Sequence, residues 1–257
     1  MPSVRYCDSH NHLQLAGEPA RIEGMLSKAR LAGVELMACT STGPEDWAKV
    51  AGLAHDHPEI IPCFGIHPWF TDQAQGDWLA DLEKRLRSTR ACVGEIGLDK
   101  LAKDKDFSLQ EKVFSQQYAL AEQLSRPAMI HCVKAWDKMT AYLKHKTSSA
   151  SFLLHAYSGG AEMVPGLAGL GAYFSFDGHV ADPKRQKLRK ALLSVPKDRL
   201  LLETDCPPED KDCSEWFAEP AGIRTVTELA AHELSMPVEE LRGIVWENSR
   251  RFFGAFL

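Results

Sequence analysis

Short apolar runs alternate with helical patterns along nearly the whole chain. The apolar runs begin near residues 4, 34, 60, 91, 127, 151, 172 and 199. Their apolar positions are continuous rather than alternating, which is typical of parallel strands buried on both faces. The segments between them carry apolar residues at helical spacing. Eight strand–helix units in about 250 residues predict an α/β fold of the (β/α)8 TIM-barrel type.

An open, doubly wound sheet is the competing architecture for such an alternation. That fold usually carries a Gly-x-Gly-x-x-Gly turn after an early strand, and no such turn is present in this sequence. No shift in composition marks a domain boundary, and we find no internal repeat. We therefore expect one barrel domain over residues 1–257.

The longest predicted helix covers residues 108–124. Ser108 precedes its apolar positions, and Glu111 follows three residues later. This spacing is that of a capping box, in which the two side chains satisfy backbone N–H groups at the start of a helix. We therefore expect Ser108 to be the N-cap.

The composition is that of an ordinary globular protein with a sizeable core. Hydrophobic residues make up 44% of the chain, charged residues 25%, and the net charge is −5. Such a charge gives no overall attraction to nucleic acid or anionic lipid, although it leaves room for a local basic groove. No apolar run approaches the roughly 20 residues that span a bilayer, and no signal peptide is recognisable at the N-terminus. We expect no membrane association and see no sign of an obligate protein partner.

The cysteines indicate a reducing compartment. There are seven of them, without CxxC spacing, and most lie within or beside apolar strand-like runs. A reduced thiol behaves there as a small hydrophobic side chain. We expect a cytoplasmic protein without disulfides.

Polar residues recur at the ends of the predicted strands, where barrel enzymes place their active sites. They are His10, His12, His67, Glu95, His131, His155 and Asp205. Any one of these histidines alone is more often a hydrogen-bonded core or surface residue. Glu95 is harder to explain in this way, because a buried carboxylate is costly unless it is paired or binds a metal. Together they predict a site for one or two divalent ions with nitrogen and oxygen ligands.

Several short motifs make the prediction more specific. In chain order they are Asp8-Ser9-His10-Asn11-His12, Gly65-Ile66-His67-Pro68, Gly94-Glu95-Ile96-Gly97-Leu98-Asp99, Ile130-His131, Leu154-His155 with Ser158-Gly159, Leu202-Glu203-Thr204-Asp205-Cys206-Pro207 and Glu247-Asn248-Ser249. This series resembles the motifs of the TatD family of metal-dependent hydrolases, within the amidohydrolase-like metal barrels. The resemblance extends over essentially the whole chain.

The resemblance implies a mononuclear or binuclear centre of Zn, Mg or Mn. It implies that His10, His12 and Asp205 hold one ion and that His131 and His155 hold the other. Glu95 would bridge the two ions, and Asp205 would position or deprotonate the attacking water, so that both residues count as catalytic. His67 and Asp99 fall in motifs near the site and are expected to contact substrate or to support the ligands.

The chain departs from the family pattern where substrate would be contacted. Family members usually carry an arginine soon after the fifth-strand histidine, but this chain has Lys134, a point charge without the bidentate fork of arginine. Lys100-Leu101 replaces a frequent aromatic pair, and the segment 208–212 is acidic. These changes weaken the expectation of a DNA substrate more than the expectation of hydrolysis.

Three functions remain open at this point. The leading one is phosphodiester hydrolysis, as in a deoxyribonuclease, with DNA or another phosphodiester as substrate. An amide, ester or lactone hydrolase would use the same centre on a small molecule. The last is a non-catalytic metal-binding barrel protein, against which the complete ligand set argues.

Overall fold

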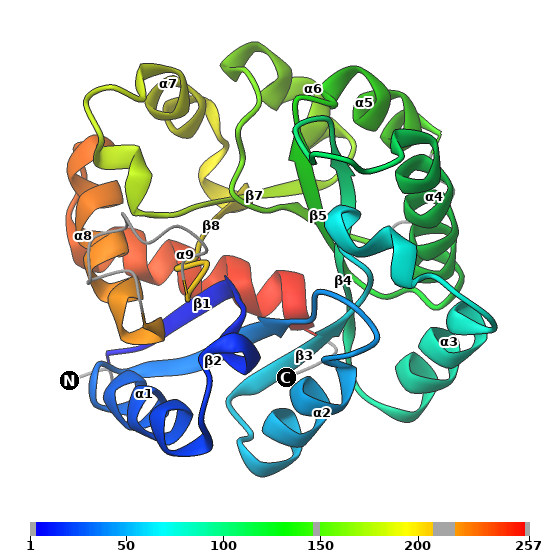
Figure 1. Ribbon diagram of the computed structural model, residues 1–257. Helices are drawn as coiled ribbons and strands as arrows, with labels where there is room; N and C mark the ends of the chain where they lie inside the picture. The colour runs from blue at the N-terminus through cyan, green and yellow to red at the C-terminus, as the bar shows by residue number, and fades with distance from the viewer. Residues whose placement is uncertain (1–3, 146–149, 208–218, 255–257) are drawn as a thin grey trace.

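The computed structural model describes residues 4–145, 150–207 and 219–254. Within them, parallel strands form one sheet in which each strand lies beside the next along the chain, from β1 to β8 (Figure 1). Their bounds are Tyr6–Asn11 (β1), Val34–Thr40 (β2), Ile60–Phe64 (β3), Cys92–Asp99 (β4), Ala128–Val133 (β5), Phe152–Leu154 (β6), Ala172–Phe176 (β7) and Leu200–Leu202 (β8). This single α/β domain confirms the predicted barrel.

Helices surround the sheet, as Figure 1 shows. The α-helices are Pro19–Leu31 (α1), Trp47–Asp56 (α2), Trp78–Ser88 (α3), Phe107–Gln123 (α4), Trp136–Lys144 (α5), Val164–Gly169 (α6), Gln186–Ser194 (α7), Ile223–Glu233 (α8) and Val238–Phe253 (α9). Among the described residues, none of these helices is long and apolar enough to cross a membrane.

The first and last strands meet and nearly close the barrel. The backbone N–H of Asp205 donates to the carbonyl of His10 (3.0 Å), and the N–H of His12 donates to the carbonyl of Cys206 (2.7 Å). The Ser9 hydroxyl adds a bond to the Leu202 carbonyl (2.9 Å). This seam places the two N-terminal histidines beside Asp205, although they are far apart in the sequence.

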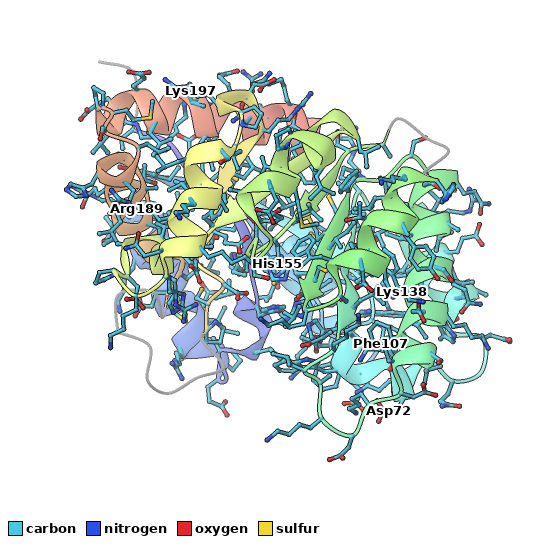
Figure 2. The ribbon with its side chains drawn as sticks, turned by 90° about the horizontal axis from the view of Figure 1, so that it is seen from above. Asp72, Phe107, Lys138, His155, Arg189 and Lys197 are labelled. Atoms are coloured by element: carbon cyan, nitrogen blue, oxygen red, sulfur yellow. The ribbon has the colours of Figure 1, made fainter. Side chains whose placement is uncertain are left out.

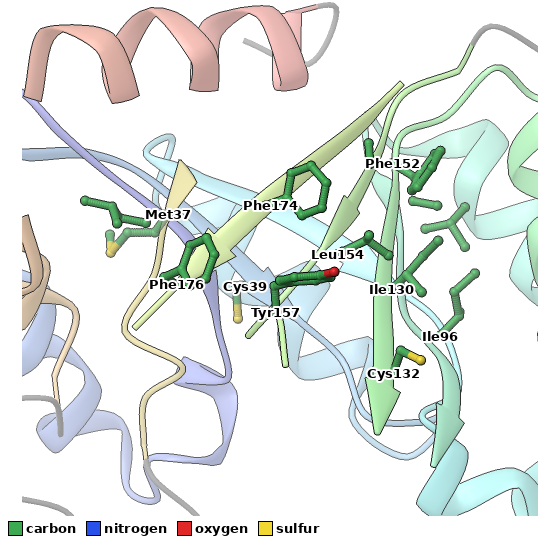
Figure 3. Packing of buried hydrophobic residues seen from close by; sticks show 14 of the residues in the cluster. Met37, Cys39, Ile96, Ile130, Cys132, Phe152, Leu154, Tyr157, Phe174 and Phe176 are labelled. Carbon is green, nitrogen blue, oxygen red and sulfur yellow. The ribbon is translucent and has the colours of Figure 1, made fainter. Parts of the chain in front are cut away.

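The main hydrophobic core lies between the strands and the surrounding helices. Figure 3 shows part of it, with Ile130, Leu154 and Phe174 on neighbouring strands, and all three are fully buried. Each of these residues is paired in register with a residue of the adjacent strand. The continuous apolar runs thus reflect strands that are buried on both sides.

A second apolar cluster lies on the other side of the strands and is closed by α9. Strand residues such as Met129, Leu153 and Leu201 pack there with Trp246 and Phe253 of α9. The Asn248 side chain ties α9 to the start of β8, because its Nδ2 donates to the carbonyls of Lys197 (2.7 Å) and Leu200 (2.8 Å). Helix α9 therefore seals the N-terminal end of the barrel, which leaves the C-terminal end for the site.

All the described cysteines are free and buried, as the sequence suggested. They are Cys7, Cys39, Cys63, Cys92, Cys132 and Cys206. Cys213 and the acidic segment 208–212 lie outside the described residues.

The predicted capping box of α4 is wrong. The helix begins at Phe107, and its N-cap is Asp106, whose Oδ1 accepts from the N–H groups of Ser108 (2.8 Å) and Leu109 (3.3 Å). A carboxylate two residues earlier satisfies free N–H groups at the start of the helix, and its charge also suits the positive end of the helix dipole. The Ser108 side chain is therefore not needed as the cap.

This correction predicts different effects for two alanine substitutions. We expect Asp106→Ala to lower the free energy of unfolding by about 1 kcal/mol, because two N–H groups lose their acceptor. Ser108→Ala, the matched control, should change it by less than about 0.5 kcal/mol. Denaturant unfolding monitored by circular dichroism measures both. A larger loss for Ser108→Ala would contradict the assignment of Asp106 as the cap.

Candidate metal centre

The two-residue repeat of β-strands carries polar side chains to the open end of the barrel. Met129, Leu153 and Leu201 belong to the apolar cluster that α9 closes. Two residues further along the same strands, on the same side, come His131, His155 and Glu203. The barrel therefore has an apolar layer at its N-terminal end and a polar layer at its C-terminal end. His155 lies near the middle of the molecule in Figure 2, with α9 at the upper edge of the view.

Glu95 lies at the centre of the polar layer, within β4 rather than at its end. Its side chain is buried, with 3% exposed. Oε2 lies 3.3 Å from His10 Nε2 and 3.2 Å from His12 Nε2. Oε1 lies 2.8 Å from His131 Nδ1 and 2.5 Å from His155 Nε2. Each carboxylate oxygen thus faces its own pair of histidines.

The first pair is completed by Asp205. The Nε2 atoms of His10 and His12 are 3.3 Å apart, and each lies 3.7 Å from Asp205 Oδ1. Ligand atoms that surround one zinc ion tetrahedrally at its usual bond lengths lie about 3.3 Å from one another. The spacing of these atoms therefore fits the ligands of a single ion.

The second pair is joined by His67. His131 Nδ1 and His155 Nε2 are 3.3 Å apart, and His67 Nε2 lies 3.3 Å from Glu95 Oε1. The rings of His67 and His131 are also in edge contact, with centroids 4.5 Å apart. The structure thus brings His67 into the cluster itself, where it is a candidate ligand as well as the substrate contact that the sequence suggested.

The chemistry of this donor set fits divalent cations. Ligand atoms of His10, His12 and Asp205 lie within 4.8 Å of one another, as do those of His67, Glu95 and His131. Imidazole nitrogen and carboxylate oxygen are ligands that Zn²⁺ and similar ions accept. So many buried nitrogen atoms pointing at one another are unfavourable without a shared positive charge. The clusters are therefore able to hold metal ions.

Comparison with known proteins agrees with this arrangement. A family model described as "TatD related DNase" matches residues 7–254. The chain belongs to the TatD family of metal-dependent hydrolases. Among its relatives, the uncharacterized metal-dependent hydrolase YjjV of Escherichia coli is 29% identical over 206 residues, which cover 79% of this chain and 80% of YjjV. The crystal structure of YjjV superposes with a TM-score of 0.90 and 25% identity, covering 98% of each chain.

A relative with an assigned activity covers almost the whole chain. The protein named 3'-5' ssDNA/RNA exonuclease TatD of Edwardsiella piscicida is 30% identical over 252 residues. The aligned region covers 93% of this chain and 95% of that protein. The TatD-type resemblance found in the sequence is thereby confirmed.

The charges and hydrogen bonds around Glu95 keep its carboxylate ionised, the form that binds a cation. Burial alone would raise the pKa of its carboxyl, but the charges of His155 and His67 and hydrogen bonds from His10 and His12 outweigh it. The pKa of Glu95 therefore lies well below its usual value, and the group is ionised. Burial holds the pKa of His10 well below its ordinary value and lowers that of His67 to about 4. Ionised carboxylate and neutral imidazole are the forms that bind metal.

Other histidines of the cluster hold a proton when no cation is present. Burial acts to lower the pKa of His12, but Glu95, Asp205 and the Thr40 carbonyl outweigh it and raise the pKa to about 9. Burial likewise opposes protonation of His155, but the charges of Glu95 and Glu203 raise its pKa well above the usual value. In the TatD chain without metal, these protons partly neutralise the carboxylates.

Partners outside the cluster fix the orientation of its histidines, a common feature of metal sites. His12 Nδ1 lies 2.7 Å from the Thr40 carbonyl, whereas His155 Nδ1 lies at an ion-pair distance of 3.5 Å from Glu203 Oε1, without a hydrogen bond among the described residues. Glu203 is fully buried and also accepts from the Ala156 N–H (2.7 Å) and the Ser175 hydroxyl. Glu203 lies in one of the recognised motifs, but no role was predicted for it from the sequence. Its position two residues after the inward-facing Leu201 was the signal that could have identified it.

Asp8 supports the segment that carries Asp205. Its buried carboxylate accepts from the Thr204 N–H (2.9 Å), from the Thr204 hydroxyl (2.6 Å) and from Asn11 Nδ2 (3.0 Å). These bonds tie β1 to the residues just before Asp205, whose own backbone is in the left-handed region with φ 53°. Asp8 was part of a recognised motif, but its role in positioning Asp205 was not foreseen.

Gly97 allows β4 and β5 to approach closely beside Glu95. A Cβ at this position would collide with the backbone carbonyl of His131. Only glycine fits, so the close contact that places His131 next to Glu95 depends on Gly97.

Two predicted substrate contacts lie in different surroundings. Asp99 is buried beside the cluster, where its Oδ2 accepts from Trp69 Nε1 (2.6 Å) and lies 3.4 Å from His131 Nε2. Burial would raise its pKa, but hydrogen bonds from His131, Trp69 and the Leu101 N–H lower it to about 2.

Lys134 follows β5 and is exposed, and it makes no hydrogen bond or ion pair with any described residue. The structure does not bring Lys134 into the cluster.

Proton release on metal binding follows from these pKa values. His12 holds its proton up to about pH 9 in the metal-free protein, and a ligand must lose its proton to bind a metal. Binding of Zn²⁺ or Mn²⁺ at pH 7.5 should therefore release protons, and the affinity should fall as the pH is lowered. Calorimetric titration in buffers of different ionisation enthalpy measures the release. Binding enthalpies that do not depend on the buffer would contradict this prediction.

Proposed function

We propose that this TatD-family hydrolase is a metal-dependent phosphodiesterase that cleaves single-stranded nucleic acid, with DNA as its principal substrate. The position of Glu95 between two histidine pairs carries the proposal, because paired ions suit the displacement of one phosphoryl oxygen by another. The family description names a DNase, and the relative from E. piscicida is named an exonuclease.

We assign the metal ligands as follows. His10, His12 and Asp205 would hold one ion and His131 and His155 the other, with the Glu95 carboxylate between the two groups. When bound, divalent ions such as Zn²⁺, Mg²⁺ or Mn²⁺ lower the pKa of water and stabilise charge on phosphoryl oxygens. One or two ions are compatible with this ligand set.

Asp205 is the best placed proton acceptor of the cluster. Its side chain is 36% exposed, whereas those of Glu95 and His10 are almost fully buried. A water molecule beside a substrate can therefore reach the Asp205 carboxylate. Burial raises the pKa of Asp205 to about 6 in the protein without metal, and a neighbouring divalent cation would lower it and keep the carboxylate ionised, as a proton acceptor must be. Asp205 thus orients the attacking water and takes its proton.

Substrate contacts surround this centre. The exposed Lys134 ammonium is free to pair with a phosphate oxygen as a point charge. His67 faces Glu95 and Asp99 faces His131. The His67 imidazole can donate a hydrogen bond to a substrate phosphate oxygen, whereas the ionised Asp99 carboxylate only accepts and holds Trp69 and His131 in place.

Amide, ester or lactone hydrolysis is the second candidate function. The same centre would serve it, and the net charge of −5 favours a small substrate over a polyanion. A non-catalytic metal-binding role accords less well with a cluster in which all the predicted ligands are together.

A substrate panel tests these alternatives. Protein loaded separately with Zn²⁺, Mn²⁺ and Mg²⁺ is assayed on a single-stranded DNA oligonucleotide, bis-p-nitrophenyl phosphate, lactones and N-acyl amino acids. We expect hydrolysis of both phosphodiesters and loss of activity after chelation, since the charge that stabilises the transition state is removed. Preferential turnover of lactones or acyl amino acids would overturn the proposal, and inactivity on every substrate would favour the non-catalytic role.

Two substitutions test the roles of the carboxylates. Glu95→Gln and Asp205→Asn should each lower kcat on bis-p-nitrophenyl phosphate by about 10²- to 10⁴-fold, because a ligand charge or the proton acceptor is lost. Asp198→Asn, an exposed carboxylate before β8, is the matched control and should keep near-normal activity. Near-normal rates in the metal-loaded Glu95 and Asp205 variants would contradict the assigned roles.

A further inference from the structure

A hollow of about 450 Å³ lies beside the metal cluster, between the segment after β3 and the loop after β4. We call it the Trp69 groove, and it is lined by Trp69, Phe70, Leu101, Ala102, Lys103 and Lys105. We propose that the Trp69 groove binds the nucleoside next to the scissile phosphodiester, with the base against its apolar wall and the next phosphate at Lys103. This inference rests on the proposed function and extends it.

One carboxylate joins the groove to the cluster. Asp99 Oδ2 accepts from Trp69 Nε1 (2.6 Å), and Asp99 Oδ1 accepts from the Leu101 N–H (2.7 Å). The same Oδ2 lies 3.4 Å from His131 Nε2. Asp99 therefore holds both walls of the groove and faces a candidate metal ligand. A substrate bound at the cluster has this groove directly beside it.

His67 forms a second link between the groove and the cluster. Its Nδ1 accepts from the Trp69 N–H (3.1 Å), and its Nε2 lies 3.3 Å from Glu95 Oε1. The Trp69 ring meets the His67 ring edge-on, with centroids 5.1 Å apart. The rigid start of the segment after β3 thus fixes the position of the Trp69 ring relative to Glu95.

The wall of the groove suits a planar, weakly polar group. Trp69 and Phe70 are half-buried, and Leu101 is 62% exposed at the mouth. A large apolar side chain so exposed beside a hydrolytic centre gains free energy when a flat partner covers it. Nucleobases stack on aromatic rings such as those of Trp69 and Phe70 with little dependence on sequence, at about 1–3 kcal/mol per base.

The charges at the groove suit a phosphate. Lys105 is partly neutralised by Asp72 at 3.4 Å. Lys103 is exposed and forms no ion pair with any described residue. In Figure 2, Asp72 and Phe107, which belong to the same region as these lysines, lie at the edge of the molecule opposite α9. An apolar wall followed by a free cation matches the alternation of base and phosphate in a single strand better than it matches an uncharged acyl group.

Binding to a slow-cleaving variant tests the proposal. Metal-loaded Asp205→Asn protein is titrated with a fluorescent single-stranded oligonucleotide, and the Kd is measured by anisotropy. Adding Leu101→Glu should weaken binding about tenfold, since a carboxylate replaces the apolar surface at the mouth of the groove and keeps a base from packing there. Adding Lys103→Gln should lower the slope of log K against log salt by about 0.7. Leu193→Glu, at a leucine that is 54% exposed on α7, and Lys84→Gln on α3 are the matched controls and should change neither.

Oligonucleotides with one abasic position complete the test. In the Asp205→Asn protein, an abasic site near the cleaved end should weaken oligonucleotide binding about tenfold. In the protein that also carries Leu101→Glu, the same abasic site should weaken binding much less, because the two changes remove the same contact. Equal costs in both backgrounds, or no oligonucleotide binding by the Asp205→Asn protein, would overturn the proposed groove. A different result would separate the two proposals. If oligonucleotide binding depends on the groove but the wild-type protein cleaves no phosphodiester, the groove is a nucleic-acid binding site and the proposed function is rejected.

Discussion

The ionised carboxylate of Glu95, buried among histidines, is the constraint on which the rest of the site depends. An unpaired charge at this depth would be prohibitively costly, so the surrounding structure must supply positive charge. Two histidines face Oε2 of Glu95 and three face Oε1, and among them His12 and His155 hold protons in the absence of a cation. This shared carboxylate joins two groups of candidate ligands into one cluster.

The barrel is what makes this convergence possible. The closed seam between β1 and β8 sets Asp205 beside His10, and Asp8 holds the intervening backbone in place. Gly97 permits the close approach of β4 and β5 that brings His131 to Glu95. At the opposite end, α9 seals the barrel with apolar side chains. Stability and chemistry are thus separated along the barrel axis, as is usual for this architecture.

The sequence predicted the barrel and the residues of the cluster because both follow simple periodic rules. Continuous apolar runs indicated buried parallel strands, and polar residues at their ends indicated the ligands. Capping was misjudged at α4, since Asp106 and Ser108 are both good caps and only the backbone geometry chooses between them. The two-residue strand repeat marks Glu203 as inward-facing after Leu201, but its contact with His155 appears only in the folded structure. The Trp69 groove was out of reach, because it depends on three-dimensional neighbours such as Asp99 that no spacing in the sequence reveals.

The central claim is that the polar layer is a metal centre organised around Glu95. Anomalous diffraction from crystals of the metal-loaded protein tests it most directly, because it locates each ion and identifies its element. We expect anomalous peaks inside the cluster, one among His10, His12 and Asp205 and, where a second ion binds, one beside His131 and His155, with Glu95 between them. A metal-loaded protein whose anomalous peaks all lie outside this cluster would contradict it.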